Sequence, residues 1–233
     1  LLDAVKNGVL IPLNQYLEKA PNLIKYSYDI SWDSLKLAGD DNIYGIPRTS
    51  IARADGYIVR KDWLDKVGLT IPEGGAVTKD EFVEILRAFT KQDPDGNGKN
   101  DTYGFAASSG ADGNMGPILT WPFGLNGWQK ADKGPYEYMN LQYSREHDNY
   151  KKALEFTQKL WKEGLIDPDW PVTRRDISIE RYKQGINGVI AEFAGWITQY
   201  LDDMLPINPN VELTYITGVK DDNGKVEGGS FGT

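Results

Sequence analysis

The alternation of short apolar runs with amphipathic segments constrains the fold of this chain more than any other feature. Residues 56–60 form a strand-like run that continues directly into a helical segment, 61–67, which Gly68 ends. The same order returns later, where the buried-strand pattern of residues 188–193 is followed by a helix that begins at Gly195. Strands that alternate with helices predict a layered α/β architecture.

Local signals define the boundaries of further elements. Thr78 and Glu81 have the spacing of a capping box, in which each side chain bonds the backbone amide of the other residue. One apolar helical face follows, made by Phe82, Ile85, Leu86 and Phe89. A long helix is expected over 146–163. The shorter expected elements are a turn at 40–42, a strand at 43–47, a solvated turn at 174–176, a helix at 179–184, a strand at 211–219 and a hairpin-type turn at 221–224.

Composition excludes several classes of protein. The 233-residue chain has a formal net charge of -8 and no basic stripe, so a phosphate backbone would be repelled and nucleic acid is not expected as a partner. It contains no cysteine, which rules out disulfides and cysteine nucleophiles within it. Its single histidine, His147, excludes a His-rich metal site. No segment reaches the apolar length of a membrane-spanning helix.

The ends of the sequence lack the usual terminal signals. The chain begins at Leu1 without an initiator methionine or a signal-peptide pattern, and it stops after the glycine-rich residues 228–233. We therefore expect a piece of a longer protein, with any export signal or lipid anchor outside this chain.

Residues 93–101 carry the sharpest chemical motif. Oxygen-bearing side chains occupy positions 1, 3, 5 and 9 of an EF-hand-like loop: Asp93, Asp95, Asn97 and Asp101. The Lys99 carbonyl, at position 7, is the fifth candidate ligand, whereas position 12 is Gly104 in place of the usual glutamate. The pattern predicts a structural calcium ion. The alternative is a surface loop in which the Asp and Asn side chains make Asx-turns.

Aromatic residues provide candidate ligand contacts, because their faces stack on the C–H faces of sugar rings. Trp196 opens a helix after a buried strand, and Trp121 lies in a glycine-flanked loop, so both are candidates, with core packing as the alternative for each. Trp128 is a weaker candidate. Arg48 follows a short strand and would bond ligand hydroxyls, or else form a surface ion pair. Trp63 and Trp161 lie on amphipathic helices and are expected in the core.

Several strings occur in a recognisable order. They are YGIP at 44–47, KDWLDK at 61–66, TKDEF at 78–82, DPDGNGK at 93–99 and KEGLIDPD at 162–169. In this order the chain resembles the family 1 extracellular solute-binding proteins, in particular the long lipoproteins of Gram-positive bacteria. The resemblance implies a periplasmic-binding-protein type II fold, with one α/β lobe nearly complete and part of the other.

The resemblance also implies organisation and function. Residues 1–53 would belong to the first lobe, 54–205 would form the second lobe with the calcium-type loop 93–101, and 206–233 would return across the hinge. The protein would be a non-enzymatic, monomeric capture component of an ABC importer. It would bind a sugar or oligosaccharide, meet two permease subunits, and be lipid-anchored outside the cell through an N-terminus absent from this chain.

Family likeness extends to individual residues. Relatives that bind acidic oligosaccharides carry calcium in the loop that matches residues 93–101, and the tryptophan that matches Trp196 often lines the sugar site of maltose-type relatives. Two other classes remain open from the residues alone. One is a calcium-stabilised glycoside hydrolase with two carboxylates. The other is a cell-surface interaction module with an exposed apolar face.

Overall fold

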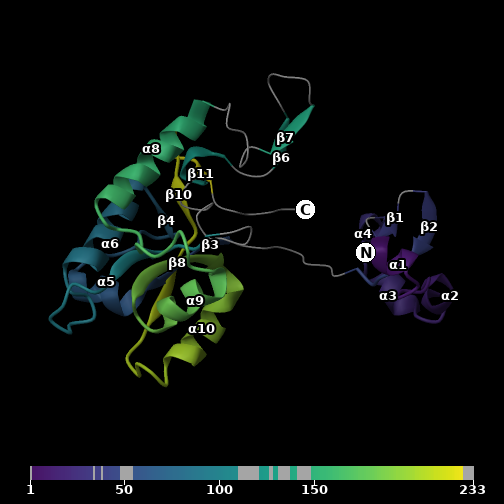
Figure 1. Cartoon of the computed structure of the whole chain (residues 1–233), viewed down its shortest axis with the longest axis horizontal. Helices are drawn as coiled ribbons and strands as arrows, with labels where there is room; N and C mark the ends of the chain where they lie inside the picture. The colour runs from purple at the N-terminus through teal and green to yellow at the C-terminus, as the bar shows by residue number, and fades with distance from the viewer. Residues whose placement is uncertain are drawn as a thin grey trace. The chain divides into compact units, whose positions relative to one another are not determined.

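The computed structural model describes residues 2–33, 35–37, 39–47, 55–109, 121–125, 128–130, 137–140 and 148–227. The chain divides into two compact units, Leu1–Ile51 and Ala52–Gly232 (Figure 1). The division lies beside the boundary expected at 53–54 from the sequence. Residues 206–227, expected to return across a hinge, contribute their strands to the larger unit.

The smaller unit is built from short elements. Its helices are α1 (Leu2–Lys6), α2 (Asn14–Leu17), α3 (Pro21–Lys25) and α4 (Asp29–Asp33), and its strands β1 (Lys36–Leu37) and β2 (Asp40–Ile43) pair antiparallel. The backbone amide of Ile43 donates to Asn14 Oδ1 over 2.9 Å, which ties β2 to α2. The prediction of a turn at 40–42 is wrong, because these residues pair with β1 and belong to β2. The strand expected at 43–47 accordingly ends at Ile43.

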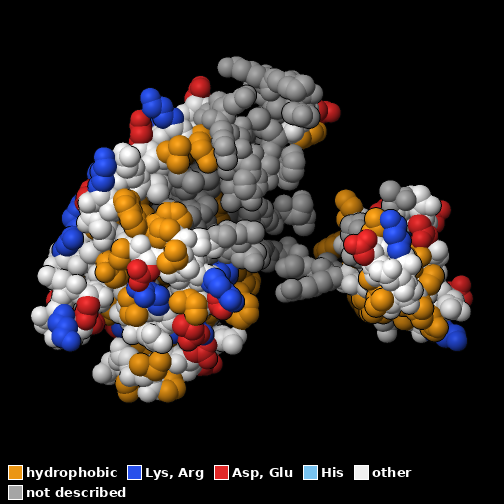
Figure 2. All heavy atoms as spheres, viewed as in Figure 1, with side chains coloured by type: hydrophobic (Ala, Val, Ile, Leu, Met, Phe, Trp, Pro, Cys, Tyr) orange, Lys and Arg blue, Asp and Glu red, His pale blue; other side chains and the backbone are white. Residues whose placement is uncertain are grey.

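Apolar side chains of the smaller unit are largely exposed. Among its described residues, Ile43 is the one hydrophobic side chain that is buried. Figure 2 shows exposed hydrophobic side chains on this unit, together with acidic and basic ones. Helices that bury no side chain of their own obtain little stability from packing within the unit.

The larger unit contains a four-stranded sheet in the order β5-β8-β3-β9. These strands are β5 (Tyr103–Ala106), β8 (Asn187–Phe193), β3 (Asp55–Arg60) and β9 (Leu213–Ile216). β5 runs parallel to β8, and β3 runs antiparallel to both β8 and β9. A smaller sheet contains β4 (Ala76–Val77), β10 (Gly218–Lys220) and β11 (Val226–Glu227), and β6 (Trp128–Lys130) pairs with β7 (Tyr138–Asn140).

Helices cover both faces of the four-stranded sheet. Tyr57 and Val59 of β3 face a core shared with α5 (Lys61–Val67), α6 (Lys79–Lys91) and α8 (Asp148–Lys162). Ile58, which points the opposite way, packs in a second core with α9 (Arg175–Lys183) and α10 (Ile197–Met204). The result is a three-layer arrangement, which agrees with the layered α/β architecture predicted by the sequence (Figure 1).

Local sequence signals place several element ends correctly. The Thr78–Glu81 capping box is formed, and the backbone hydrogen bond from Thr78 lowers the pKa of the Glu81 carboxyl. Gly68 closes α5 with φ of 73°, a left-handed conformation that glycine adopts without strain. The strand expected at 211–219 is divided, since β9 ends at Ile216 and β10 begins at Gly218 in the other sheet.

The packing of β8 against α6 depends on the absence of a side chain at Gly188. A Cβ at this position would lie 2.1 Å from the Phe89 ring, far inside contact distance. Phe89 is itself fully buried and meets Trp63 edge to face, with ring centroids 5.4 Å apart. The ring therefore has little room to move away.

We expect Gly188→Ala to lower the free energy of unfolding by about 1–3 kcal/mol, because overpacking a dense core forces side chains off their preferred rotamers. Urea unfolding followed by circular dichroism measures the change. The double variant Gly188→Ala/Phe89→Leu should show a smaller loss than the sum of the two single variants, since the shorter side chain makes room for the methyl group. Additive losses would contradict the proposed clash.

Candidate functional site

One edge of the four-stranded sheet collects the carboxyl ends of three strands. Because β3 runs antiparallel to its neighbours, its first residue, Asp55, pairs with Phe193 at the end of β8, and β9 ends beside them at Ile216. β5 ends at the same edge, since it is parallel to β8. We call this side the C-terminal edge. In open α/β sheets, ligands bind outside the carboxyl ends of the strands.

A buried carboxylate forms the base of the C-terminal edge. The Glu192 side chain is 1% exposed, and it shares the face of β8 that packs against α9 and α10. Arg175, the first residue of α9, donates to Glu192 Oε1 and forms an ion pair with it. The Tyr200 hydroxyl donates to the same oxygen over 3.2 Å, and the amide of Phe193 donates to Oε2 over 3.2 Å. A buried charge requires such partners.

Above this network lies an exposed indole. Trp196 belongs to a short 3₁₀ turn, η3 (Ala194–Trp196), which joins β8 to α10, and it is 44% exposed. Its ring stacks on Tyr200, with centroids 6.4 Å apart and an interplanar angle of 26°. The Lys183 ammonium lies 5.3 Å from the centroid of the Tyr200 ring. Trp196 is thus a supported aromatic surface at the C-terminal edge.

Burial raises the pKa of the Tyr200 hydroxyl, and the neighbouring Glu192 carboxylate raises it further. Tyr200 therefore remains a hydrogen-bond donor to Glu192 at neutral pH.

Two further contacts fix the shape of the edge. The Tyr215 hydroxyl donates to the backbone carbonyl of Glu192 over 2.8 Å, linking β9 to β8 across β3. The intervening residue is Gly56, where a Cβ would lie 2.4 Å from the Ile216 carbonyl and 3.0 Å from the Tyr215 ring. On the other side, the Ser109 amide donates to the Thr173 carbonyl over 2.9 Å, which holds the start of α9 beside the end of β5.

Hydrogen bonds connect the polar side chains of the loop at 93–101. The Asn97 side-chain amide donates to Asp95 Oδ2 over 2.7 Å and to Asp101 Oδ1 over 3.1 Å. Asp93 accepts from the amides of Asn97 and Gly98, each over 3.0 Å. The Lys99 backbone amide donates to Asn97 Oδ1 over 2.8 Å, so the Asn97 amide occupies the centre of the carboxylates.

Two carboxyl groups of this loop have pKa values shifted in opposite directions. Burial raises the pKa of the Asp95 carboxyl, and a hydrogen bond with Asp93 raises it further. Burial also opposes ionisation of Asp93, but hydrogen bonds from backbone amides lower its pKa below the ordinary value. Two carboxyls that share one site in this way would gain from a cation between them.

Residue 104 cannot supply the missing metal ligand. A Cβ at Gly104 would lie 2.5 Å from the Leu86 carbonyl, because β5 crosses α6 closely at this point. A glutamate at the twelfth loop position is therefore sterically excluded. Within the described ranges, no three Asp, Glu, His or Cys side chains lie close enough together to hold a metal ion. The donor types suit calcium, while their present geometry is that of Asx-turns closed on Asn97.

The remaining candidates from the sequence have different positions. Trp121 is 9% exposed and contacts Tyr57 with ring centroids 5.9 Å apart, so its ring packs in the core. Trp128 belongs to β6, but its side chain lies outside the described residues, as does Arg48. Their part in ligand binding stays a prediction.

The expectation for Trp63 is confirmed, because its side chain is almost fully buried against Phe89. The expectation that Trp161 lies in the core is wrong, since its side chain is 41% exposed. α8 turns Leu160 into the core instead, and the next residue projects about 100° further around the helix. Trp161 packs edge to face on Trp170, with centroids 6.2 Å apart.

Sequence reasoning missed Glu192 and Arg175. The solvated turn expected at 174–176 is wrong for Arg175, which opens α9 four residues before the expected helix and reaches buried Glu192. Arg174 does form an exposed ion pair with Asp176, over 2.9 Å. The signal that was available is a charged residue inside the apolar run 188–193, since a buried charge implies a partner elsewhere in the chain.

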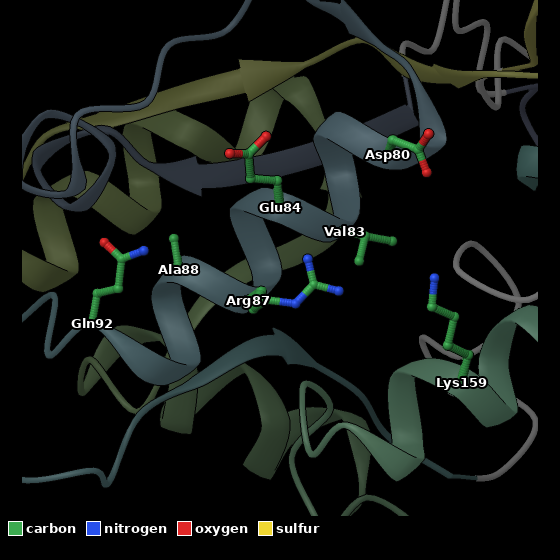
Figure 3. A pocket seen from close by; sticks show the side chains of 7 residues that line it. All are labelled: Asp80, Val83, Glu84, Arg87, Ala88, Gln92 and Lys159. Carbon is green, nitrogen blue, oxygen red and sulfur yellow. The ribbon is translucent and has the colours of Figure 1, made fainter.

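A separate hollow of about 410 Å³ lies between α6 and α8 (Figure 3). Arg87 extends from α6 toward the side of α8, where its guanidinium pairs with Glu163 over 2.7 Å. The lining is Asp80, Val83, Glu84, Arg87, Ala88, Gln92 and Lys159. It holds charges of both signs and no aromatic ring, so it lacks the stacking surface that the C-terminal edge provides.

Searches for relatives give a consistent picture, although no protein-family model matches the chain. The polygalacturonan/rhamnogalacturonan-binding protein YtcQ of Bacillus subtilis is 30% identical over 194 residues, which cover 81% of this chain and 36% of that protein. The lipoprotein LipO of the same organism is 36% identical over a match that covers 73% of this chain and 32% of LipO. The fructooligosaccharide ABC transporter substrate-binding protein FusA of Streptococcus pneumoniae is 30% identical, with 72% and 32% covered. The chain thus spans about a third of the length of these relatives.

Solved structures agree on the fold. FusA in complex with kestose superposes with a TM-score of 0.68 at 23% identity, covering 97% of this chain and 46% of that one. An EF-hand mutant of FusA in complex with fructo-nystose gives the same TM-score at 22% identity, covering 98% and 46%. The expected type II periplasmic-binding-protein fold is confirmed, and this chain forms a part of that fold.

The names of these relatives describe binding proteins and a lipoprotein, and none denotes an enzyme. This agrees with the expectation of a non-catalytic protein. By its sequence and its fold, the chain belongs to the family of ABC-transporter substrate-binding proteins.

Proposed function

We propose that this chain forms part of the solute-capturing component of an ABC importer and binds a carbohydrate at the C-terminal edge. The observation that carries the proposal is the exposed Trp196 ring, held by Tyr200 above the buried Glu192–Arg175 pair. An indole face stacks on the apolar face of a sugar ring, and the partly exposed guanidinium of Arg175 presents hydrogen-bond donors to hydroxyl groups.

The relatives support a carbohydrate ligand. YtcQ is named for polygalacturonan and rhamnogalacturonan, and FusA for fructooligosaccharide. Both names refer to chains of sugar units, for which a cleft with an aromatic wall is suited. A glycoside hydrolase, the rival from another class, has no counterpart among these names.

In this proposal the protein acts by closing on its ligand. The solute binds the larger unit first, and contacts from the other lobe then shift the equilibrium toward a closed form by their differential affinity. The closed form is what two permease subunits would recognise. Residues 206–233 would lead back across the hinge, and Arg48 and Trp128 stay candidates for further ligand contacts.

The proposed location is the outer face of the cell membrane. LipO is named a lipoprotein, and substrate-binding components work outside the permease that they serve. None of the helices in the described part of the chain has the length and apolar content that a bilayer crossing needs. We propose that a lipid anchor at the N-terminus of the natural protein attaches it there. We also propose that the protein is a monomer.

We also propose that residues 93–101 hold a structural calcium ion. Asp95 and Asp101 already accept from the Asn97 side-chain amide, and Asp93 accepts from the backbone amides of Asn97 and Gly98. These oxygen donors are of the type that calcium prefers. Rotation of the Asn97 side chain would present its oxygen in place of its nitrogen. The solved EF-hand mutant of FusA indicates that such a loop occurs in a relative. Calcium would hold the turn between α6 and β5.

Trp196→Ala should weaken sugar binding by about tenfold or more, because an aromatic contact contributes on the order of 1 kcal/mol beyond the area that it buries. Isothermal titration of the intact natural protein with a panel of oligosaccharides measures the effect. The matched control is Trp161→Ala, which removes an indole of nearly equal exposure from α8 (41% against 44%). Equal losses in the two variants would contradict a site at the C-terminal edge.

Calcium should raise the melting temperature of the wild-type protein, by the equivalent of about 2.7 kcal/mol at a concentration a hundred times the Kd. Asp93→Asn and Asp95→Asn should reduce or abolish this rise. The control is Asp221→Asn, because Asp221 accepts from two backbone amides in a second Asp-rich turn and should leave the calcium response intact. A wild-type protein that melts alike in calcium and in EDTA would contradict the proposal.

A further inference from the structure

We infer that the C-terminal edge selects uncharged oligosaccharides over uronic-acid oligosaccharides, with the Glu192–Arg175 pair as the determinant. The inference rests on the proposed sugar-binding function and names the ligand class of the same site. The two kinds of ligand differ in charge, so the electrostatics of the edge decide between them.

The cation of this edge is already neutralised. Arg175 lies at the rim, 36% exposed, and its guanidinium pairs with a carboxylate that is 1% exposed. A buried carboxylate cannot regain solvation, so it holds the guanidinium more strongly than an exposed partner would. An incoming uronate would have to compete with Glu192 for Arg175, and Glu192 would be left buried without its ion-pair partner if the uronate succeeded.

The overall charge of the chain acts in the same direction. Its formal net charge of -8 adds long-range repulsion for an anionic ligand.

A neutral sugar encounters no such penalty. Its hydroxyl groups both donate and accept, so they can bond the outer N–H groups of Arg175 without separating it from Glu192. Its C–H face can lie on Trp196, which the Tyr200 ring supports from behind. The Glu192–Arg175 pair therefore orients the hydroxyl groups of a neutral sugar, and the same two side chains disfavour an anionic ligand.

Sequence similarity alone does not distinguish the two ligand classes. YtcQ and FusA are each 30% identical to this chain, although the first is named for polygalacturonan, whose units carry carboxylates, and the second for fructooligosaccharide, whose units carry none. The charge distribution at the C-terminal edge favours the second class.

The test compares neutral and acidic trisaccharides of equal length, with kestose and maltotriose against trigalacturonate, by isothermal titration of the intact natural protein. We expect at least tenfold tighter binding of a neutral ligand, with an affinity that changes little between low and high salt. Glu192→Gln should move the affinity ratio at least tenfold toward trigalacturonate, because it frees Arg175 to meet an anion. The control is Glu163→Gln, the same substitution in the ion pair with Arg87 beside the separate hollow between α6 and α8, which should leave the ratio unchanged.

The outcomes separate this inference from the proposed function. Preferential binding of trigalacturonate by the wild-type protein would overturn the inference and leave sugar binding standing, as would an unchanged ratio in a folded Glu192→Gln variant. Binding of neither class, across the whole sugar panel, would overturn the proposed function and the inference with it. If Glu192→Gln fails to fold by circular dichroism, the wild-type ratio decides alone.

Discussion

The position of β8 between β5 and β3 is the constraint on which the rest of the larger unit depends. β8 pairs parallel with β5 and antiparallel with β3. The ends of β5 and β8 and the start of β3 therefore meet at a common edge. Gly188 lets the strand approach Phe89 of α6 closely enough for this sheet to form. The residues that follow β8 then emerge where ligands bind in open α/β sheets.

Charged groups hold β8 at both ends. Near its start, Asn187 donates to the buried Asp167 carboxylate over 3.4 Å, and Arg181 of α9 donates to the same group over 2.7 and 3.0 Å. Near its end, Glu192 binds Arg175 of the same helix. α9 is therefore tied to β8 through two arginines that lie six positions apart. Buried pairs of this kind gain little net stability, but breaking one is costly, so they favour a single register of helix on strand.

Much of the fold could be predicted because its signals are local. The helix that starts after Thr78 and the left-handed closure at Gly68 follow from neighbouring residues, which makes them independent of distant packing. The errors arose where distant contacts decide. Pairing with β1 turned residues 40–42 into a strand, and the rotation of α8 exposed Trp161 while it buried Leu160.

The sequence by itself determined the α/β class, the family resemblance and the oxygen-rich loop at 93–101, since each depends on residue order and short spacing. Only the tertiary structure decided which side chains share the candidate site. Arg175, Glu192, Trp196 and Tyr200 are distributed over a helix, a strand, a turn and a second helix. Their contacts exist because the sheet and its two covering helices bring these elements to one edge, and that arrangement depends on long-range pairing that no local pattern encodes.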